Sequence, residues 1–322
     1  MHLNNVGSQW LRRYAVFVAC CTFGLLIAGA LVASNDAALS VPDWPLSWGH
    51  LVPTLEGGIR YEFAHRVAAM LVGLLTVGLA VAMQWGQSLP HGRGSDGGIA
   101  LRADTLPALQ SEPLQSEPRP SGSVTRLAWA AVAVVVAQAA LGGVAVRFVT
   151  PAWATIAHAS LGQLFFGIMV AICVKLYAGA DAGRPILAPA MICMLTLFAQ
   201  SVLGAAVRYG VVAGVTHIAG AAVAIAAVMW AALSILMQHT DDPKLRRPAM
   251  LLLSITFSQV FLGIAAMMAR IVYANSPQPM PVMVWFTVAH VAVGSLALGA
   301  AVVVAMLVRP DVFVATGRQV TA

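Results

Sequence analysis

The sequence predicts an all-α polytopic membrane protein with eight transmembrane helices, arranged as two tandem, pseudo-symmetric four-helix bundles. Three observations predict this fold class. Hydrophobic residues make up 60% of the 322 positions and charged residues only 9%, whereas soluble domains carry about 25% charged residues. Apolar runs of about 20 residues, the length that crosses a bilayer, recur along the chain. The second half of the chain also repeats motifs of the first half in the same order.

Eight apolar runs follow one another along the chain. They lie at about 14–33, 63–85, 127–146, 152–174, 186–207, 211–237, 248–269 and 281–308. The first run is long for a signal peptide, so we expect it to be a transmembrane helix. The segment 86–123 is rich in Gly, Ser, Pro and Gln, and such a composition buries too little apolar surface to become ordered. It predicts a disordered cytoplasmic loop inside the first half.

The formal net charge of +6 follows the expected membrane topology. Of the 18 Lys and Arg residues, only Arg60, Arg66, Arg147, Arg208 and Arg270 fall at the outer face when the N-terminus is cytoplasmic. This positive-inside bias predicts that both termini are cytoplasmic. The basic charge therefore gives no indication of nucleic-acid binding. The four cysteines all lie inside predicted helices, which argues against a structural disulfide or zinc site.

A repeat divides the chain near residue 180, into an N-terminal half of residues 1–180 and a C-terminal half of residues 181–322. His158 and His290 each open the pattern His-x-x-x-Gly-x-Leu-x-x-Gly, and His65 and His217 form a weaker match. The motif Gln-x-x-Leu-Gly begins at Gln138, Gln200 and Gln259, in the third, fifth and seventh runs. Four crossings return a chain to its starting side, so we expect two parallel halves related by an axis along the membrane normal.

Four of the eight histidines lie in the outer third of the even-numbered runs: His65, His158, His217 and His290. Ionisable residues within a membrane are costly and mostly functional. Imidazole ligates heme iron, zinc or copper, but zinc or copper would usually recruit carboxylate or thiolate partners, and no such cluster lies near. A plain structural role, in which each histidine hydrogen-bonds a neighbouring helix, is the alternative. The pattern favours one bis-histidine heme site in each half.

Small and basic residues surround these histidines. Gly162, Gly167, Gly294 and Gly299 would make room for a flat macrocycle, although small residues also serve helix packing. Four arginines stand at the outer helix ends, where heme propionates need cationic partners or where side chains simply reach the membrane interface. They are Arg66 and Arg147 in the first half, and Arg208 and Arg270 in the second.

Glu62 distinguishes the two halves. It lies three residues before His65, so a helix places both on one face, whereas Gly214 holds the corresponding position before His217. A carboxylate in a low-dielectric site can act as a general base or stabilise positive charge. It could also be an interfacial acid paired with Arg66 or Arg60. The asymmetry predicts a working site in the first half and an accessory site in the second.

At these residues the sequence resembles the heme A synthase family. The resemblance covers nearly the whole chain and is most specific in the first outer loop and the helix start after it. The matching residues are Leu39-Ser40-Val41-Pro42-Asp43-Trp44-Pro45-Leu46, Pro53-Thr54 and Glu62-Phe63-Ala64-His65-Arg66.

The resemblance implies an activity and a role for each site residue. Members of the family oxidise the C8 methyl group of heme O to a formyl group, by successive hydroxylations and loss of water from a geminal diol. The product, heme A, serves cytochrome oxidase assembly. By position, His217 and His290 would ligate a permanent heme b, while His65 and His158 would ligate the substrate heme O, with Glu62 as the catalytic carboxylate.

The resemblance also implies a location and partners. We expect a multi-pass protein of a bacterial-type cell inner membrane, with heme O, a heme O synthase, an electron acceptor and the lipid bilayer as partners, and a homo-oligomer is compatible with this prediction. The chain departs from the family in lacking an outer-loop cysteine pair and in having Ala33 where an arginine often stands. The alternatives are a non-catalytic di-heme b electron-transfer protein and a transporter, which would bind no heme.

Overall fold

The computed structural model describes residues 3–44, 46–88, 122–178 and 187–308. Within these residues there are eight helices and no strands. The helices are α1 (Leu3–Ser34), α2 (Ile59–Ser88), α3 (Gly122–Arg147), α4 (Ala152–Ala178), α5 (Leu187–Arg208), α6 (Gly214–Gln238), α7 (Pro243–Val272) and α8 (Pro281–Leu307). Each predicted apolar run therefore corresponds to one helix, and the predicted all-helical class is confirmed.

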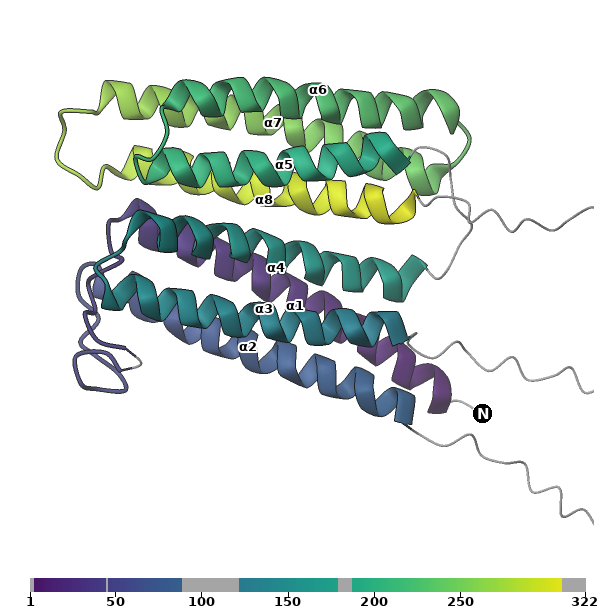
Figure 1. Cartoon of the computed structure of the whole chain (residues 1–322), viewed down its shortest axis with the longest axis horizontal. Coiled ribbons are helices and arrows are strands. Elements are labelled where there is room, and N and C mark those ends of the chain that lie inside the picture. The colour runs from purple at the N-terminus through teal and green to yellow at the C-terminus, as the bar shows by residue number, and fades with distance from the viewer. Residues whose placement is uncertain (1–2, 45, 89–121, 179–186, 309–322) are drawn as a thin grey trace, which may run out of the picture.

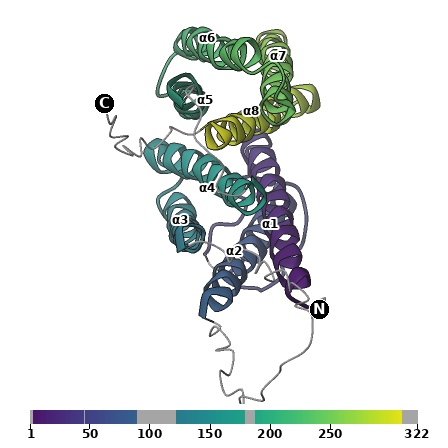
Figure 2. The same cartoon turned by 90° about the vertical axis from the view of Figure 1, so that its right-hand side faces the viewer.

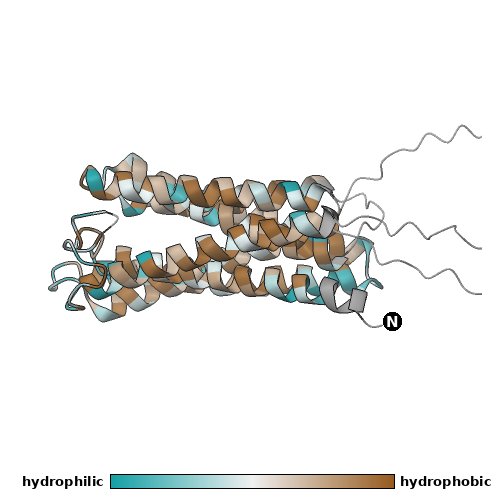
Figure 3. Cartoon of the chain, turned by 90° about the horizontal axis from the view of Figure 1, so that it is seen from below, coloured by the Kyte–Doolittle hydropathy of each residue, from teal (hydrophilic) through white to brown (hydrophobic). Residues whose placement is uncertain are grey.

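All eight helices are long and apolar enough to cross a membrane, which indicates a multi-pass membrane protein. Hydrophobic residues cover the length of the helices, and hydrophilic residues gather toward the helix ends and in the loops (Figure 3). The helices also expose large apolar side chains such as Phe257, Phe261 and Trp230. In water such a surface would be strongly unfavourable, whereas in a bilayer it faces acyl chains.

Contacts between the helices close two rings. Helices α1 to α4 each contact two others of their own group, and α5 to α8 do the same. Figure 1 shows the two groups side by side, with the four connections between odd and even helices at one end and the N-terminus at the other. Seen end-on, α8 lies against both α4 and α1 (Figure 2), and α5 contacts α4.

Several helix ends differ from the predicted spans for local reasons. We predicted that the seventh span begins at residue 248, but α7 begins at Pro243. Asp242 caps this start by accepting a hydrogen bond from the backbone N–H of Lys244 at 2.9 Å, and proline is tolerated in a first helical turn because its missing N–H has no partner there. The predicted loop 86–123 is shorter at both ends, since α2 continues to Ser88 and α3 begins at Gly122. Its remaining residues, 89–121, lie outside the described part of the chain, as does the boundary near residue 180.

Small residues bring the two halves together along α4 and α8. A Cβ on Gly299 would lie 3.1 Å from Phe166 and one on Gly167 would lie 3.7 Å from Val302. In the same interface Gln163 donates a hydrogen bond to the Ser295 hydroxyl at 2.9 Å. We predicted that Gly167 and Gly299 leave room for a macrocycle, but the structure gives them a role in packing between the halves, which was the alternative.

Candidate functional site

The four intramembrane histidines lie in two matching pairs. His65 on α2 faces His158 on α4, and the centroids of their rings are 6.3 Å apart with the planes at 77°. His217 on α6 faces His290 on α8, again with 6.3 Å between the centroids, and the planes are at 80°. All four stand in the first three turns of their helices, at the end where the odd–even connections lie. The structure thus brings together the residues that the repeat predicts to be partners.

The separation of the rings suits two axial ligands of one iron. An imidazole nitrogen lies about 2 Å from a metal that it ligates and about 1.2 Å from its own ring centroid. Two opposed imidazoles on one metal therefore have centroids about 6 Å apart, which matches both observed pairs. Among the described residues, no group of three or more His, Cys, Asp and Glu side chains could hold a metal ion. Each pair therefore offers two imidazole ligands, which is the number of axial positions on heme iron.

A glycine on the preceding helix makes room for each histidine ring. A Cβ on Gly29, Gly142, Gly204 or Gly263 would lie 2.9–3.4 Å from the Cε1 atom of His65, His158, His217 or His290, respectively. Cβ contacts this short are rare in protein structures, so any larger residue at these positions would clash with the imidazole ring.

Sequence reasoning did not assign these four glycines to the site, although the signal was present. Three of them end the Gln-x-x-Leu-Gly motif, and Gly29 aligns with Gly204 in the repeat. The spacing of the motif alone does not show that its last residue faces an imidazole on another helix.

Glu62 and Arg66 form a buried pair at the start of α2. The Arg66 Nη2 atom lies 2.5 Å from Glu62 Oε1, and Glu62 is 4% exposed. The other carboxylate oxygen of Glu62 accepts a hydrogen bond from the backbone N–H of Val41 at 2.8 Å. Glu62 is therefore both one helical turn from His65 and paired with Arg66, the arrangement we had weighed as its alternative role.

The Arg66 guanidinium ties the α1–α2 loop to α2. It donates hydrogen bonds to the backbone carbonyl oxygens of Asp43 at 2.7 Å, Leu46 at 3.0 Å and Val41 at 2.9 Å. Trp44, in the same loop, lies over the outer end of α3, where a Cβ on Gly143 would be 3.4 Å from its ring. The loop motif and the Glu-x-x-His-Arg helix start, which are separate in the sequence, thus form one unit above the His65–His158 pair.

Asp43 shapes the tip of this loop. Its carboxylate accepts hydrogen bonds from the backbone N–H groups of Trp48 at 2.7 Å and Gly49 at 2.8 Å. These bonds, the one from Gly49 first, hold the pKa of the Asp43 carboxyl below its usual range. At neutral pH the Asp43 carboxylate is therefore ionised and accepts both backbone hydrogen bonds that hold the loop tip.

We expect Arg66→Leu to destabilise the protein by about 3 kcal/mol, because it leaves the buried Glu62 carboxylate without its counter-ion and frees three loop carbonyls. Thermal unfolding of the purified protein in detergent would measure this loss. Arg60→Leu is the matched control, because Arg60 is exposed and bonds only its neighbour Tyr61 at 3.1 Å. If both variants unfolded at the same temperature, Arg66 would not hold the loop.

The other arginines differ in their surroundings. Arg208 donates hydrogen bonds to the carbonyl oxygen of Ala33 and to the Asp36 carboxylate at 3.2 Å, which links the end of α5 to the end of α1. Arg147 and Arg270 are exposed at the ends of α3 and α7. The proposed propionate roles of Arg66, Arg147, Arg208 and Arg270 stay predictions. Of the four, Arg147 and Arg270 have exposed side chains.

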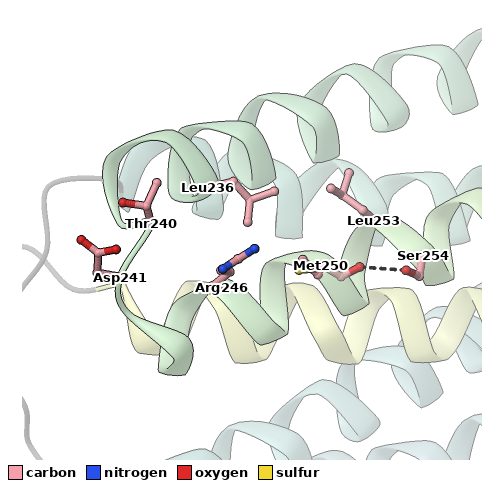
Figure 4. A pocket seen from close by; sticks show the side chains of 7 residues that line it. All are labelled: Leu236, Thr240, Asp241, Arg246, Met250, Leu253 and Ser254. Carbon is pink, nitrogen blue, oxygen red and sulfur yellow. Dashed lines mark hydrogen bonds between the residues drawn. The ribbon is translucent and has the colours of Figure 1, made fainter.

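A hollow on the surface lies away from the histidines. It is a groove of about 550 Å³ between the end of α6 and the start of α7. Figure 4 shows its lining residues, with Arg246 and Asp241 near the α6–α7 connection and Leu253 deeper along the helices. This connection is at the end opposite to the histidine pairs, so the groove is not part of the candidate site (Figure 1).

Comparison with known proteins gives one limited similarity. A segment of 71 residues is 38% identical to a heme A synthase of Halalkalibacterium halodurans. The match spans 22% of this chain and 22% of the length of that protein. No family model matches the chain.

Proposed function

We propose that this protein is a heme A synthase, which oxidises the C8 methyl group of heme O to a formyl group for cytochrome oxidase assembly. The observation that carries the proposal is the unequal surroundings of two otherwise equal histidine pairs. Glu62 and the loop tied by Arg66 lie beside His65 and His158, whereas α6 has no acidic residue in its first turn. The similarity to a named heme A synthase supports the same conclusion.

In this proposal the two halves bind different hemes. His65 and His158 ligate the substrate heme O in the N-terminal half. His217 and His290 ligate a resident heme b, which supplies one-electron redox chemistry when bound. The glycines that face the rings and the ring separation of 6.3 Å support the fit of these groups to both sites.

Glu62 would serve as the proton acceptor at the N-terminal site. Its carboxylate lies at the helix start of His65 and accepts a hydrogen bond from the Val41 N–H of the α1–α2 loop. Converting a methyl group to a formyl group with water as the oxygen source releases four electrons and four protons, so the enzyme needs an electron acceptor as a partner. We further propose a bacterial-type inner membrane location with both termini cytoplasmic, and a heme O synthase as the supplier of substrate.

Extracted-heme analysis of the purified protein tests the proposal. When the protein is co-expressed with a source of heme O, we expect heme B and heme A in the extract and a Soret band in the intact protein. The competing function is a non-catalytic di-heme b electron carrier, which the equal geometry of the two pairs favours. It predicts heme B alone. A protein that bound no heme under any condition would overturn both.

A further inference from the structure

The glutamines of the Gln-x-x-Leu-Gly motif all face the histidine of the following helix. Gln138 Nε2 donates to the His158 carbonyl oxygen at 2.8 Å, while the His158 Nδ1 lies 3.1 Å from the Gln138 carbonyl oxygen. Gln200 Nε2 donates to the His217 carbonyl oxygen at 2.8 Å and lies 3.1 Å from its Nδ1. Gln259 Nε2 lies 3.4 Å from His290 Nε2. A glutamine thus lies against a histidine between α3 and α4, α5 and α6, and α7 and α8. The glutamine side chain reaches the histidine backbone carbonyl in the first two pairs and the imidazole ring in the last two.

A second glycine, one turn after each of these histidines, makes room for the glutamine. A Cβ on Gly162 would lie 3.1 Å from Gln138 Nε2, and one on Gly294 would lie 2.8 Å from Gln259 Nε2. A Cβ on Gly220 would contact Gln200 as well. The glutamine and the two glycines therefore form one repeated unit around the histidine.

The α1–α2 pair lacks this unit although it keeps the rest of the arrangement. Gly29 faces the His65 ring, but Leu25 stands four residues before it, where the other helices have glutamine. Ala69 stands four residues after His65, where α4 and α8 have glycine. The Nδ1 atoms of His65 and His290 are both buried without a hydrogen-bond partner among the described residues. His290 still has Gln259 Nε2 3.4 Å from its Nε2 atom, whereas Leu25 offers His65 no polar group. Of the four histidines, His65 is thus held least firmly by its neighbouring helix.

We propose that Gln138, Gln200 and Gln259 are positioning residues that fix the orientation of three iron ligands, and that Leu25 leaves His65 free to release its iron. The proposal rests on the proposed heme-binding function. Hydrogen bonds from outside the ligand shell orient metal-bound imidazoles, and their loss typically costs about 10- to 100-fold in metal affinity. The C-terminal pair, with a glutamine at both ligands, therefore holds its heme, and the N-terminal pair exchanges it through His65.

Heme release from the full-length protein tests this proposal. The protein is loaded with ferric heme b, and the transfer of heme to excess apomyoglobin is followed, with the two phases assigned by His65→Ala and His217→Ala. We expect the N-terminal site to release heme at least about tenfold faster than the C-terminal site. Gln200→Leu should speed release from the C-terminal site about tenfold. The double variant Leu25→Gln with Ala69→Gly should slow release from the N-terminal site.

Gln163→Leu is the matched control, because the same substitution there removes a hydrogen bond to Ser295 and none to a histidine. A positioning role also predicts a spectroscopic change. Gln200→Leu should alter the low-spin ferric signal in electron paramagnetic resonance, because the angle of 80° between the His217 and His290 ring planes would no longer be fixed. Gln163→Leu should leave this signal unchanged. If Gln200→Leu and Gln163→Leu behaved alike in both measurements, the proposal would be overturned. Failure of the proposed function has a different signature, namely no heme in the unaltered protein.

Discussion

Replacing Glu62 by glutamine is expected to abolish heme A formation while both hemes stay bound. Glutamine keeps the size of the side chain and can still accept the hydrogen bond from the Val41 N–H, so the loop has little reason to move. It cannot accept a proton at neutral pH. Loss of a general base costs about 10²- to 10⁴-fold in rate. Extracted-heme analysis after co-expression with a heme O source should therefore give heme B and heme O, with heme A reduced at least about 100-fold.

Glu56→Gln supplies the control for this experiment. It makes the same change of charge in the same outer connection, but Glu56 is exposed, so heme A should accumulate as in the unaltered protein. A Glu62→Gln variant that still formed heme A would limit Glu62 to pairing with Arg66. A variant that lost its heme altogether would show that the pair is needed for the architecture of the site.

The Gly263→Ala substitution is expected to remove the heme of the C-terminal site, so that the bound heme falls by about half. The added Cβ would lie 2.9 Å from the Cε1 atom of His290, and the ring would have to turn away from its partner His217. Overpacking of this kind costs about 1–3 kcal/mol, and here the cost falls on the orientation of His290, the proposed iron ligand. Pyridine-hemochrome quantification per mole of protein would measure the loss.

Gly24→Ala and Gly73→Ala are matched controls within transmembrane helices. Nothing lies within 4 Å of a Cβ built at either position, and alanine in a helix is favoured over glycine by about 1 kcal/mol. Both variants should bind heme fully and unfold at the same temperature or higher. Equal heme content in Gly263→Ala would contradict the close fit of glycine and ring.

The sequence was sufficient to predict the helices because the signal for them is local. A membrane span needs only length and apolar composition, and each predicted run became one helix. The pairing of His65 with His158 and of His217 with His290 also followed from the sequence, since the repeat places one histidine at the same depth in every even helix. The helix ends were less predictable, as at α7, where Asp242 and Pro243 start the helix ahead of the apolar run.

Contacts between helices were beyond the sequence argument. The glycine that faces each ring and the glutamine that reaches each histidine belong to one motif, but their targets lie on another helix and depend on how the two helices are rotated. Arg66 shows the same difficulty. From its sequence position near the start of α2, Arg66 could bind either a heme propionate or the neighbouring loop. Only the fold shows that its guanidinium donates hydrogen bonds to three backbone carbonyl oxygens of the loop.

The central place of α8 has a consequence for how the protein is made. This helix contacts α1, α4, α5 and α7, and its membrane-spanning window is 56% buried, the largest share of the eight. It also enters the membrane after the seven others, because it follows them in the chain. The His65–His158 pair can therefore form on the ribosome once four helices are inserted, whereas the His217–His290 pair and the seam between the halves must wait for α8. The second histidine pair is thus completed late in biogenesis, and under the proposed function its iron porphyrin would enter after α8. A nascent chain arrested before α8 would leave the facing sides of α1 and α4 open to lipid.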